Sequence, residues 1–372
     1  MSSLSTTLSE IRNFEPVDVL SGQEPVIIYG AGAFGRDVAR ALRQQGHNVL
    51  GFMDRSGTTD IEGLPCRHPE SDLRDWQAVG ATVLLGLHNY GVNPLQVHDQ
   101  LHALGFPRVY LPVEYHRGLE KELGDRYWLG GHGSYRHHQD EIQAVFDLLS
   151  DEKSRALFIS TLEYRALNRP ESHPTAEPEL AYFPLDLPRW EEPLSWVDGG
   201  ACDGDTLRAF PFDRYRCADV YAFEPDPKNY AILQTALRQF RTKSPASRAA
   251  SWPCGLGKDN VVLKFKTGLG FASAADASGD SYCPVTQLDT VLQGSPVNLI
   301  KLDIEGAEPD ALLGAREIIA EQKPGLAICI YHTPGHLWEI PLDIARRHTG
   351  YRFYLRCHGQ SSFDLVLYAL QA

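Results

Sequence analysis

A glycine-rich turn between two predicted strands, with an acid at the end of the second strand, constrains the fold most. The turn, residues 196–206, reads Trp-Val-Asp-Gly-Gly-Ala-Cys-Asp-Gly-Asp-Thr, and Glu224 follows its last glycine by 20 positions, after the predicted strand 220–223. Glycines let the backbone approach a ligand closely, and a strand-end carboxylate can accept both hydroxyls of a ribose. Asp226 and Pro227 are a suitable N-cap and first residue for the next helix. This order predicts an α/β fold that binds a nucleoside-containing cofactor.

The charge of the turn indicates which cofactor it binds. Three carboxylates occupy the place where the pyrophosphate of a dinucleotide would lie, which is electrostatically unfavourable. A sulfonium cation with an ammonium group fits better, so the sequence favours S-adenosylmethionine over NAD. The alternative is an acidic turn whose aspartates only cap the chain. The residues expected at the cofactor are Asp198, Gly199, Gly200, Ala201, Asp203, Asp205, Glu224, Pro225 and Asp303.

A second motif completes a family resemblance. Residues 300–308 read Ile-Lys-Leu-Asp-Ile-Glu-Gly-Ala-Glu. Together with the turn and Phe223-Glu224-Pro225, this run resembles the FkbM family of S-adenosylmethionine-dependent O-methyltransferases over about residues 191–372. Residues 326–340 and 351–356 look like the late strands of that family. The resemblance implies methylation of a hydroxyl on a small molecule.

The predicted catalytic residues lie at the ends of two strands. Methyl transfer to an alcohol requires alignment of the acceptor and removal of its proton. Asp303 and Glu305 follow the strand 298–302 and are expected to shape the pocket beside the sulfonium, and His332 follows the next strand as the leading candidate base, since its ordinary pKa lies near neutrality. Alternatively, Asp303 caps a turn, Glu305 orients Lys301 and His332 is a satisfied strand-end histidine. The same three residues could instead bind a divalent cation that polarises adjacent hydroxyls.

Two further segments flank this motif. Glu308 and Asp310 begin a predicted helix, where their charge suits the helix dipole, and they need no catalytic role. The loop 268–280 is rich in small residues and could close on the acceptor, with Ser273 as its polar contact, or could merely connect two strands.

The first half of the chain carries a separate glycine motif. After the predicted strand 25–29, Gly30, Gly32 and Gly35 form G-x-G-x-x-G, and Asp54 lies 19 positions further at the end of the next strand. This segment resembles the N-terminal domain of bacterial sugar acyltransferases that bind nucleotide-sugars, although the hexapeptide repeat of those enzymes is missing. It predicts a nucleotide or nucleotide-sugar site, or a purely structural lobe. A short-chain dehydrogenase is not favoured, because no tyrosine has a lysine four positions later.

These patterns predict two Rossmann-like lobes joined by a helical connector. We expect a nucleotide-binding domain at 1–117, a connector at 118–190 and a class I methyltransferase domain at 191–372, whose mostly parallel sheet ends in an antiparallel hairpin. In the connector, apolar spacing predicts two helices separated near residues 150–151. Six prolines between 168 and 193 indicate an extended segment that faces the substrate or lies between the domains. Earlier in the connector, the cluster of His132, His137 and His138 is expected in an exposed polar loop, not at a metal.

Composition excludes several classes of protein. Forty-eight acidic residues against 35 Lys and Arg give a net charge of −13, which disfavours nucleic acid as a partner. The seven cysteines lack Cys-x-x-Cys spacing, so neither a disulfide framework nor a zinc knuckle is expected. No apolar run approaches the roughly 20 residues that span a bilayer. We therefore expect a cytoplasmic enzyme without a membrane partner.

The predicted function is S-adenosylmethionine-dependent O-methylation of a sugar or nucleotide-sugar. A natural-product hydroxyl is an alternative acceptor for the same chemistry. Two other hypotheses remain open at this point. One is an NAD-dependent sugar-modifying oxidoreductase that uses the first lobe, and the other is a nucleotide-sugar-binding module without turnover.

Overall fold

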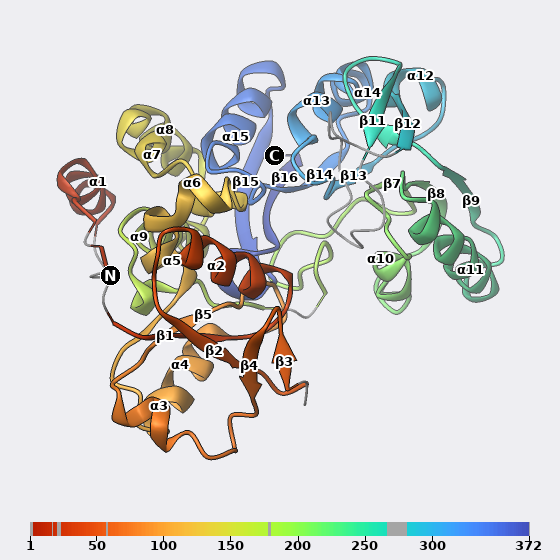
Figure 1. Ribbon diagram of the computed structural model, residues 1–372. Helices are drawn as coiled ribbons and strands as arrows, with labels where there is room; N and C mark the ends of the chain where they lie inside the picture. Colours follow the sequence, from red (N-terminus) through yellow and green to blue (C-terminus); the bar gives the residue numbers. More distant parts are fainter. Residues whose placement is uncertain are drawn as a thin grey trace.

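The computed structural model describes residues 3–16, 18–20, 24–56, 59–177, 180–265 and 281–371. The loop 268–280 with Ser273, predicted to close on the acceptor, lies outside these residues. Figure 1 shows the first lobe below and the second lobe above, with the connector helices beside both. The predicted α/β architecture of two sheet-based lobes is confirmed.

The first lobe is a six-stranded sheet in the order β3-β4-β2-β1-β5-β6, parallel except for the pair β3 and β4. Alternate residues of its first strand enter two separate cores: Val26 and Ile28 pack with α2, and Ile27 and Tyr29 with α3 and α4. Helices therefore cover both faces, as in doubly wound folds. The elements are β1 (Val26–Tyr29), α2 (Ala33–Gln44), β2 (Val49–Met53), β3 (Asp60–Ile61), β4 (Leu64–Arg67), α3 (Arg74–Ala78), β5 (Thr82–Leu85), α4 (Pro94–Ala103) and β6 (Val109–Tyr110).

The second lobe is a seven-stranded sheet in the order β15-β16-β14-β13-β7-β8-β9. Only β16 runs antiparallel to its neighbours, which confirms the predicted hairpin on a mostly parallel sheet. The strands are β7 (Leu194–Gly199), β8 (Cys217–Phe223), β9 (Arg248–Trp252), β13 (Leu299–Leu302), β14 (Gly325–Cys329), β15 (Tyr351–Cys357) and β16 (Leu365–Gln371). The helices are α10 (Asp205–Arg208), α11 (Pro227–Lys243), α12 (Leu288–Val291), α13 (Glu308–Leu313), α14 (Arg316–Gln322) and α15 (His336–Arg347).

A small three-stranded sheet, which the sequence did not predict, lies beside this lobe. Its order is β10-β12-β11, from β10 (Gly255–Leu256), β11 (Val261–Phe265) and β12 (Ser281–Thr286). β11 and β12 pair antiparallel, so they bring both ends of the undescribed loop together.

The helices between the two sheets divide between the lobes. α5 (Pro112–Tyr115) and α6 (Glu120–Leu123) pack in a core of the first lobe. α7 (His132–His137), α8 (Gln139–Leu148) and α9 (Glu152–Ala166) share the core of the second lobe. α8 contacts α15, and α9 contacts β15. The predicted break near residues 150–151 is confirmed, because Asp151 caps α9 by accepting the N–H of Ser154. The predicted histidine loop is instead helical at residues 132–137; His137 is exposed, as predicted, whereas His138 is half-buried and stacks on Trp338.

The first helix, α1 (Leu4–Asn13), also differs from expectation. Instead of joining the first lobe, as the boundary at residue 117 implies, it contacts α7 and α9. Leu4, Leu8 and Ile11 are buried in the same core as the second sheet. The sequence analysis did not predict this helix, and the spacing of its apolar residues could not indicate its partner.

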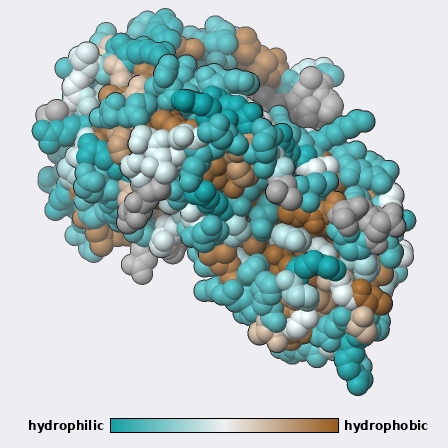
Figure 2. All heavy atoms as spheres, turned by 90° about the vertical axis from the view of Figure 1, so that its left-hand side faces the viewer, coloured by the Kyte–Doolittle hydropathy of each residue, from teal (hydrophilic) through white to brown (hydrophobic). Residues whose placement is uncertain are grey.

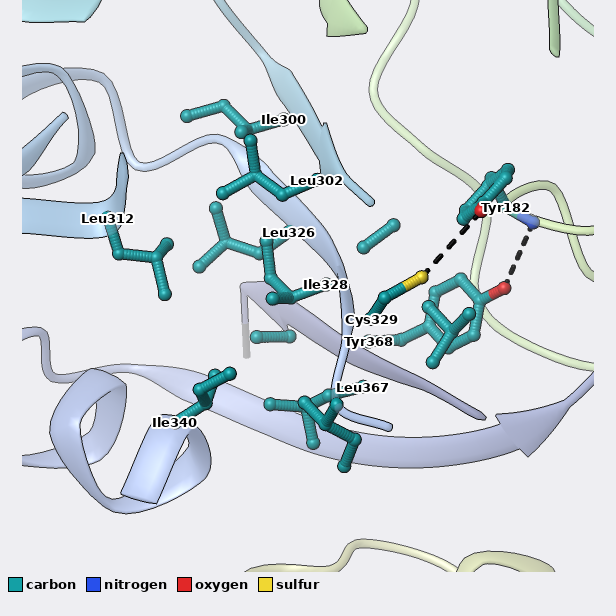
Figure 3. Close-up of a cluster of buried hydrophobic side chains, with 14 of the residues drawn as sticks. Tyr182, Ile300, Leu302, Leu312, Leu326, Ile328, Cys329, Ile340, Leu367 and Tyr368 are labelled. Carbon is teal, nitrogen blue, oxygen red and sulfur yellow. Dashed lines mark hydrogen bonds between the residues drawn. The ribbon is translucent and has the colours of Figure 1, made fainter. Parts of the chain in front are cut away.

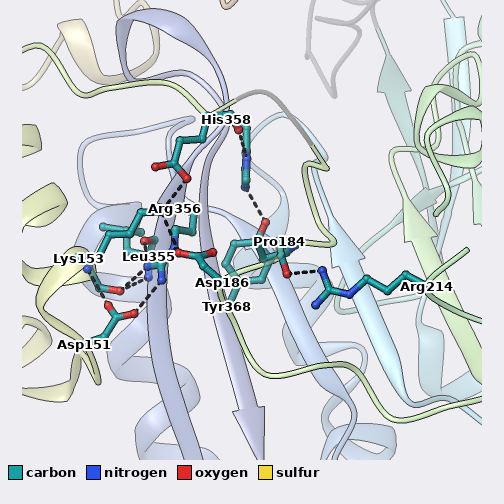
Figure 4. A network of polar contacts seen from close by, with 11 residues as sticks. Asp151, Lys153, Pro184, Asp186, Arg214, Leu355, Arg356, His358 and Tyr368 are labelled. Atoms are coloured by element: carbon teal, nitrogen blue, oxygen red, sulfur yellow. Dashed lines mark hydrogen bonds and ion pairs between the residues drawn. The ribbon is translucent and has the colours of Figure 1, made fainter.

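Arg356 fastens β15 to the connector (Figure 4). This arginine is 2% exposed at its side chain, and its Nη2 lies 2.7 Å from Asp151 Oδ2 while its Nε lies 2.9 Å from Asp186 Oδ2. Nη1 also donates to Ser154 Oγ at 3.0 Å. One buried cation thus joins the strand, the start of α9 and the proline-rich segment.

The proline-rich segment also packs on the sheet through Tyr182 (Figure 3). The backbone N–H of Tyr182 donates to the hydroxyl of Tyr368 in β16 at 3.0 Å. Its hydroxyl lies 3.7 Å from Sγ of Cys329 in β14. The segment is therefore held against the second sheet.

The view in Figure 2 shows a largely hydrophilic surface with scattered apolar patches. Among the described residues, no helix has both the length and the apolar character needed to cross a membrane.

Candidate functional site

A cavity of about 720 Å³ lies at the carboxyl edge of the second sheet. Gly200, Glu224 and Asp303 line it, and each directly follows a strand: β7, β8 and β13. This edge is where open α/β sheets bind ligands. Among the described residues, acidic side chains in the lining outnumber basic ones, which favours a cationic ligand. They are Asp203, Asp205, Glu224, Asp259, Asp303, Glu305, Asp310 and Asp364, against Arg208, Lys258 and Lys301.

The glycine-rich turn is locked from behind by a buried ion pair. Lys301 Nζ lies 3.0 Å from Asp198 Oδ1 and donates to the carbonyls of Gly199 and Gly200. Gly200 has a φ of +71°, and a Cβ there would lie 1.9 Å from the carbonyl oxygen of Asp303. The turn therefore requires glycine in order to pack against the end of β13.

Glu224 holds the front of the turn. Its Oε2 accepts the backbone N–H of Cys202 at 2.9 Å, and its Oε1 accepts that of Asp226 at 2.7 Å. The residue is 5% exposed, and burial raises the pKa of its carboxyl to about 7. Each carboxylate oxygen keeps a second lone pair that can face the cavity.

The predicted cofactor residues divide into two groups. Gly200, Asp203, Asp205, Glu224, Pro225 and Asp303 line the cavity. Asp198, Gly199 and Ala201 are buried behind it. The second group shapes the turn, so its members could affect a cofactor only through the first.

Asp303 is fully engaged by its neighbours. Its Oδ2 accepts the hydroxyl of Tyr182 at 3.0 Å, and its Oδ1 accepts that of Tyr331 at 3.1 Å. Burial alone would raise the pKa of Asp303, but His332, Lys301 and the tyrosine bond lower it overall. Asp303 is thus held as an anion at the floor of the cavity.

Glu305 has fewer partners. It lies in the turn after β13 with a φ of +57°, an uncommon conformation for a residue other than glycine. The hydroxyl of Tyr127 donates to its Oε2 at 3.5 Å, a long hydrogen bond. Burial, with the carboxylates of Asp303 and Glu308, raises the pKa of Glu305 to about 7, although His332 opposes this shift.

His332 lies behind both carboxylates. Its Nε2 is 3.4 Å from Asp303 Oδ1 and 3.7 Å from Glu305 Oε2, and its side chain is 2% exposed. Burial alone would lower the pKa of His332, but Glu308, Asp303 and Glu305 raise it to about 9. The structure brings all three predicted catalytic residues together, with only the two carboxylates in the lining of the cavity.

The comparisons with known proteins identify a family for the second half of the chain. Residues 198–353 match the model of the methyltransferase FkbM domain. This part of the chain belongs to the FkbM methyltransferase family. The protein is therefore a methyltransferase.

A solved structure shares the whole architecture. It is the crystal structure of methyltransferase FkbM from Methylobacillus flagellatus KT, with 21% identity, 99% of each chain covered and a TM-score of 0.81. At this identity the likeness concerns the fold, which extends through the first lobe and the connector as well as the FkbM domain. A search of curated proteins finds no match.

Several residues at the FkbM site were missed by sequence reasoning. Tyr182 reaches it from the proline-rich segment, and Asp364 reaches it from the loop before β16, where burial and the carboxylate of Asp303 raise the pKa of its carboxyl to about 7. Tyr331 stands next to His332, and Tyr127 comes from the connector. The only available signal was adjacency to a recognised motif, which applied to Tyr331 alone.

The first lobe contributes one residue to the lining of the FkbM cavity. Tyr90, in the segment after β5, lines the cavity, and its carbonyl accepts the N–H of Gln360 at 2.8 Å. The segment after β5 in the first lobe therefore reaches the cavity of the second lobe.

The glycine motif of the first lobe has the predicted local form. A Cβ at Gly35 would lie 2.0 Å from the carbonyl oxygen of Gly30, so the helix approaches the strand closely there. A Cβ at Gly32 would meet no atom within 4 Å. Asp54 Oδ2 accepts the N–H of Ala31 at 2.7 Å. Gly30 and Gly35 thus serve packing, and Gly32 leaves room at the turn.

Proposed function

We propose that this methyltransferase transfers the methyl group of S-adenosylmethionine to a hydroxyl of a small molecule. The observation that carries the proposal is the acid-rich cavity beside Glu224. Its carboxylates favour a sulfonium and an ammonium group, and Glu224 at the end of β8 suits a ribose diol. The cavity volume of about 720 Å³ lies within the range of sites for small molecules and cofactors.

Glu305 is the residue that we assign as the base. An acceptor hydroxyl must lose its proton as the methyl group is transferred. Asp303 already accepts two tyrosine hydroxyls, whereas Glu305 has one long hydrogen bond and faces the cavity. His332 supports both carboxylates from behind, which differs from the sequence-based hypothesis that it removes the proton itself.

The proposed acceptor is a sugar or nucleotide-sugar. Tyr90, Tyr182 and Tyr331 provide aromatic and hydroxyl groups around the cavity, a combination that suits the apolar faces and hydroxyls of a sugar. The first lobe, with its glycine motif and Asp54, would hold the nucleotide part of such a molecule. An NAD-dependent oxidoreductase that uses the first lobe is not favoured, because the family match supports methyl transfer.

Mass spectrometry of reaction products tests the proposal. The enzyme is incubated with S-adenosylmethionine and a panel of nucleotide-sugars, free sugars and phenolic alcohols. We expect a sugar-containing acceptor to gain the mass of one methylene group. When the product is then acetylated, it should take up one acetyl group fewer than the unmethylated acceptor, because one hydroxyl is blocked. Methylation of phenols alone would reject the sugar, and methylation at nitrogen or sulfur would reject the proposed chemistry.

A further inference from the structure

Three buried side chains converge behind the cavity. Glu308 begins α13, His332 follows β14, and His336 is the first residue of α15. Their side chains are 0%, 2% and 5% exposed. One donor atom from each residue lies within 4.8 Å of the donor atoms of the other two. Three separate segments of the second lobe thus bring metal-ligating groups to one place.

Hydrogen bonds account for only one of these donor atoms: Glu308 Oε1 accepts the backbone N–H of Ile304 at 2.8 Å. His332 Nδ1 lies 3.0 Å from Glu308 Oε1, and His336 Nδ1 lies 3.6 Å from Glu308 Oε2. Neither contact has hydrogen-bond geometry, so both nitrogens and Glu308 Oε2 are buried without a hydrogen-bond partner. Buried polar atoms are almost always partnered, and each exception requires an explanation.

The negative charge around His332 also requires an explanation. Asp303, Glu305 and Glu308 all lie within 4 Å of the His332 ring. Over the described part of the chain, the ion pairs of Glu305 and Glu308 are formed with histidines only. A divalent cation among these groups would balance the carboxylates without requiring a charged imidazole.

We propose that Glu308, His332 and His336 bind one zinc-like divalent ion. Two imidazole nitrogens and a carboxylate suit zinc and neighbouring transition metals, whereas magnesium and calcium prefer oxygen donors. The donor separations of 3.0 and 3.6 Å fit a single ion with bonds of about 2.0 to 2.2 Å. The predicted metal set of Asp303, Glu305 and His332 shares only His332 with this cluster.

The geometry also gives the ion a positioning role. With Nδ1 on the ion, His332 would carry its proton on Nε2, which lies 3.4 Å from Asp303 Oδ1 and has no hydrogen-bond partner among the residues that the structure describes. A ligating histidine commonly donates its second N–H to a carboxylate, which fixes the ring. None of the three ligands lines the cavity, so the ion would hold Asp303 in place without touching the substrate.

Zinc titration tests the site, with a second histidine pair as the matched control. His98 and His102 lie one turn apart on α4 with their Nε2 atoms 3.1 Å apart, and this pair can also bind zinc. We therefore use the full-length His102→Gln protein, stripped with a chelator, as the reference. It should take up one zinc equivalent, measured by calorimetry and elemental analysis, with a raised melting temperature. Magnesium should produce neither effect.

Removal of a ligand from the buried cluster should have the opposite result. The double variant His102→Gln/His336→Gln should bind zinc at least about tenfold more weakly and show no rise in melting temperature. Circular dichroism of the metal-free forms checks that the double variant folds. If the double variant does not fold, Glu308→Gln takes the place of His336→Gln. The proposal is overturned if His102→Gln takes up no zinc at micromolar concentration, or if loss of His336 or Glu308 leaves its affinity unchanged.

Discussion

Two carboxylates in this chain hold glycine-rich turns in the same way. Glu224 accepts the N–H of Cys202 in the second lobe, and Asp54 accepts that of Ala31 in the first. Only Glu224 is buried enough for its pKa to rise to about 7, whereas hydrogen bonds lower the pKa of Asp54 despite the opposing effect of burial. The same position in the fold therefore carries different chemistry, and each residue is a control for the other.

Glu224→Gln should weaken the binding of S-adenosylmethionine. The amide keeps the size of the side chain but removes the charge that strengthens hydrogen bonds to the ribose, a loss of roughly 1.5 to 3 kcal/mol. The dissociation constant, measured by calorimetry, should rise about tenfold or more. Asp54→Asn should leave it unchanged. Equal affinity of the wild-type and Glu224→Gln proteins would contradict the proposed contact.

The affinity of the wild-type protein should also depend on pH. The carboxylate of Glu224 is the binding form, and it takes up a proton as pH falls through about 7. Affinity should therefore be complete at pH 8 and about tenfold lower at pH 6. The measurement is a calorimetric series from pH 5.5 to 8.5. The Glu224→Gln series should lack this component, and an identical slope in both proteins would assign the effect elsewhere.

Glu305→Gln should lower turnover with little effect on the cofactor. Loss of a general base typically reduces kcat by about 10² to 10⁴. The affinity for S-adenosylmethionine should stay within about twofold, because Glu224 and the turn are untouched. Single-turnover kinetics with a methylated-product assay separates the two quantities. Near wild-type kcat would exclude Glu305 as the base and return the search to Asp303 and His332.

At the scale of elements, sequence patterns predicted most of the strands that flank the two sites and the motifs that follow those strands. Val26–Tyr29 and Leu299–Leu302 are runs of buried apolar residues followed by glycine or acid motifs, so strand and turn were both visible. What remained hidden depends on long-range contacts. Tyr182 and Asp364 reach the site from segments without a periodic signal, and the partner of α1 lies about 140 residues away along the chain. Glu308 was expected to serve only the helix dipole, because adjacency to His336 exists only in the folded chain.

The start of α9 is an element whose loss we can quantify. Asp151→Ala removes both the N-cap and one of the two carboxylates that contact the buried Arg356. The free energy of unfolding should fall by about 2 to 4 kcal/mol, more than a cap alone contributes. Urea denaturation followed by circular dichroism measures it. Glu152→Ala, one residue further and exposed, is the control and should change stability by under about 0.5 kcal/mol. A fall of only about 1 kcal/mol, the contribution of the cap alone, would show that the Arg356 network contributes nothing.

At the scale of the whole molecule, the two lobes share one cavity through the segment after β5. Tyr90→Ala should raise the KM for the acceptor about fivefold to tenfold, because an aromatic contact of this kind contributes about 1 kcal/mol or more. The affinity for S-adenosylmethionine should remain as in the wild type. Steady-state kinetics and calorimetry give the two values. A change in cofactor affinity alone would place Tyr90 on the cofactor side.

The packing of α1 on α9 has a consequence for synthesis on the ribosome. α1 leaves the exit tunnel before α9, which follows about 140 residues later, roughly 7 to 28 s at about 5 to 20 residues per second. During that interval the strands and helices of the first lobe emerge and can close their own two cores. α1 is thus made before the first lobe but can reach its packing partner only after that lobe has emerged.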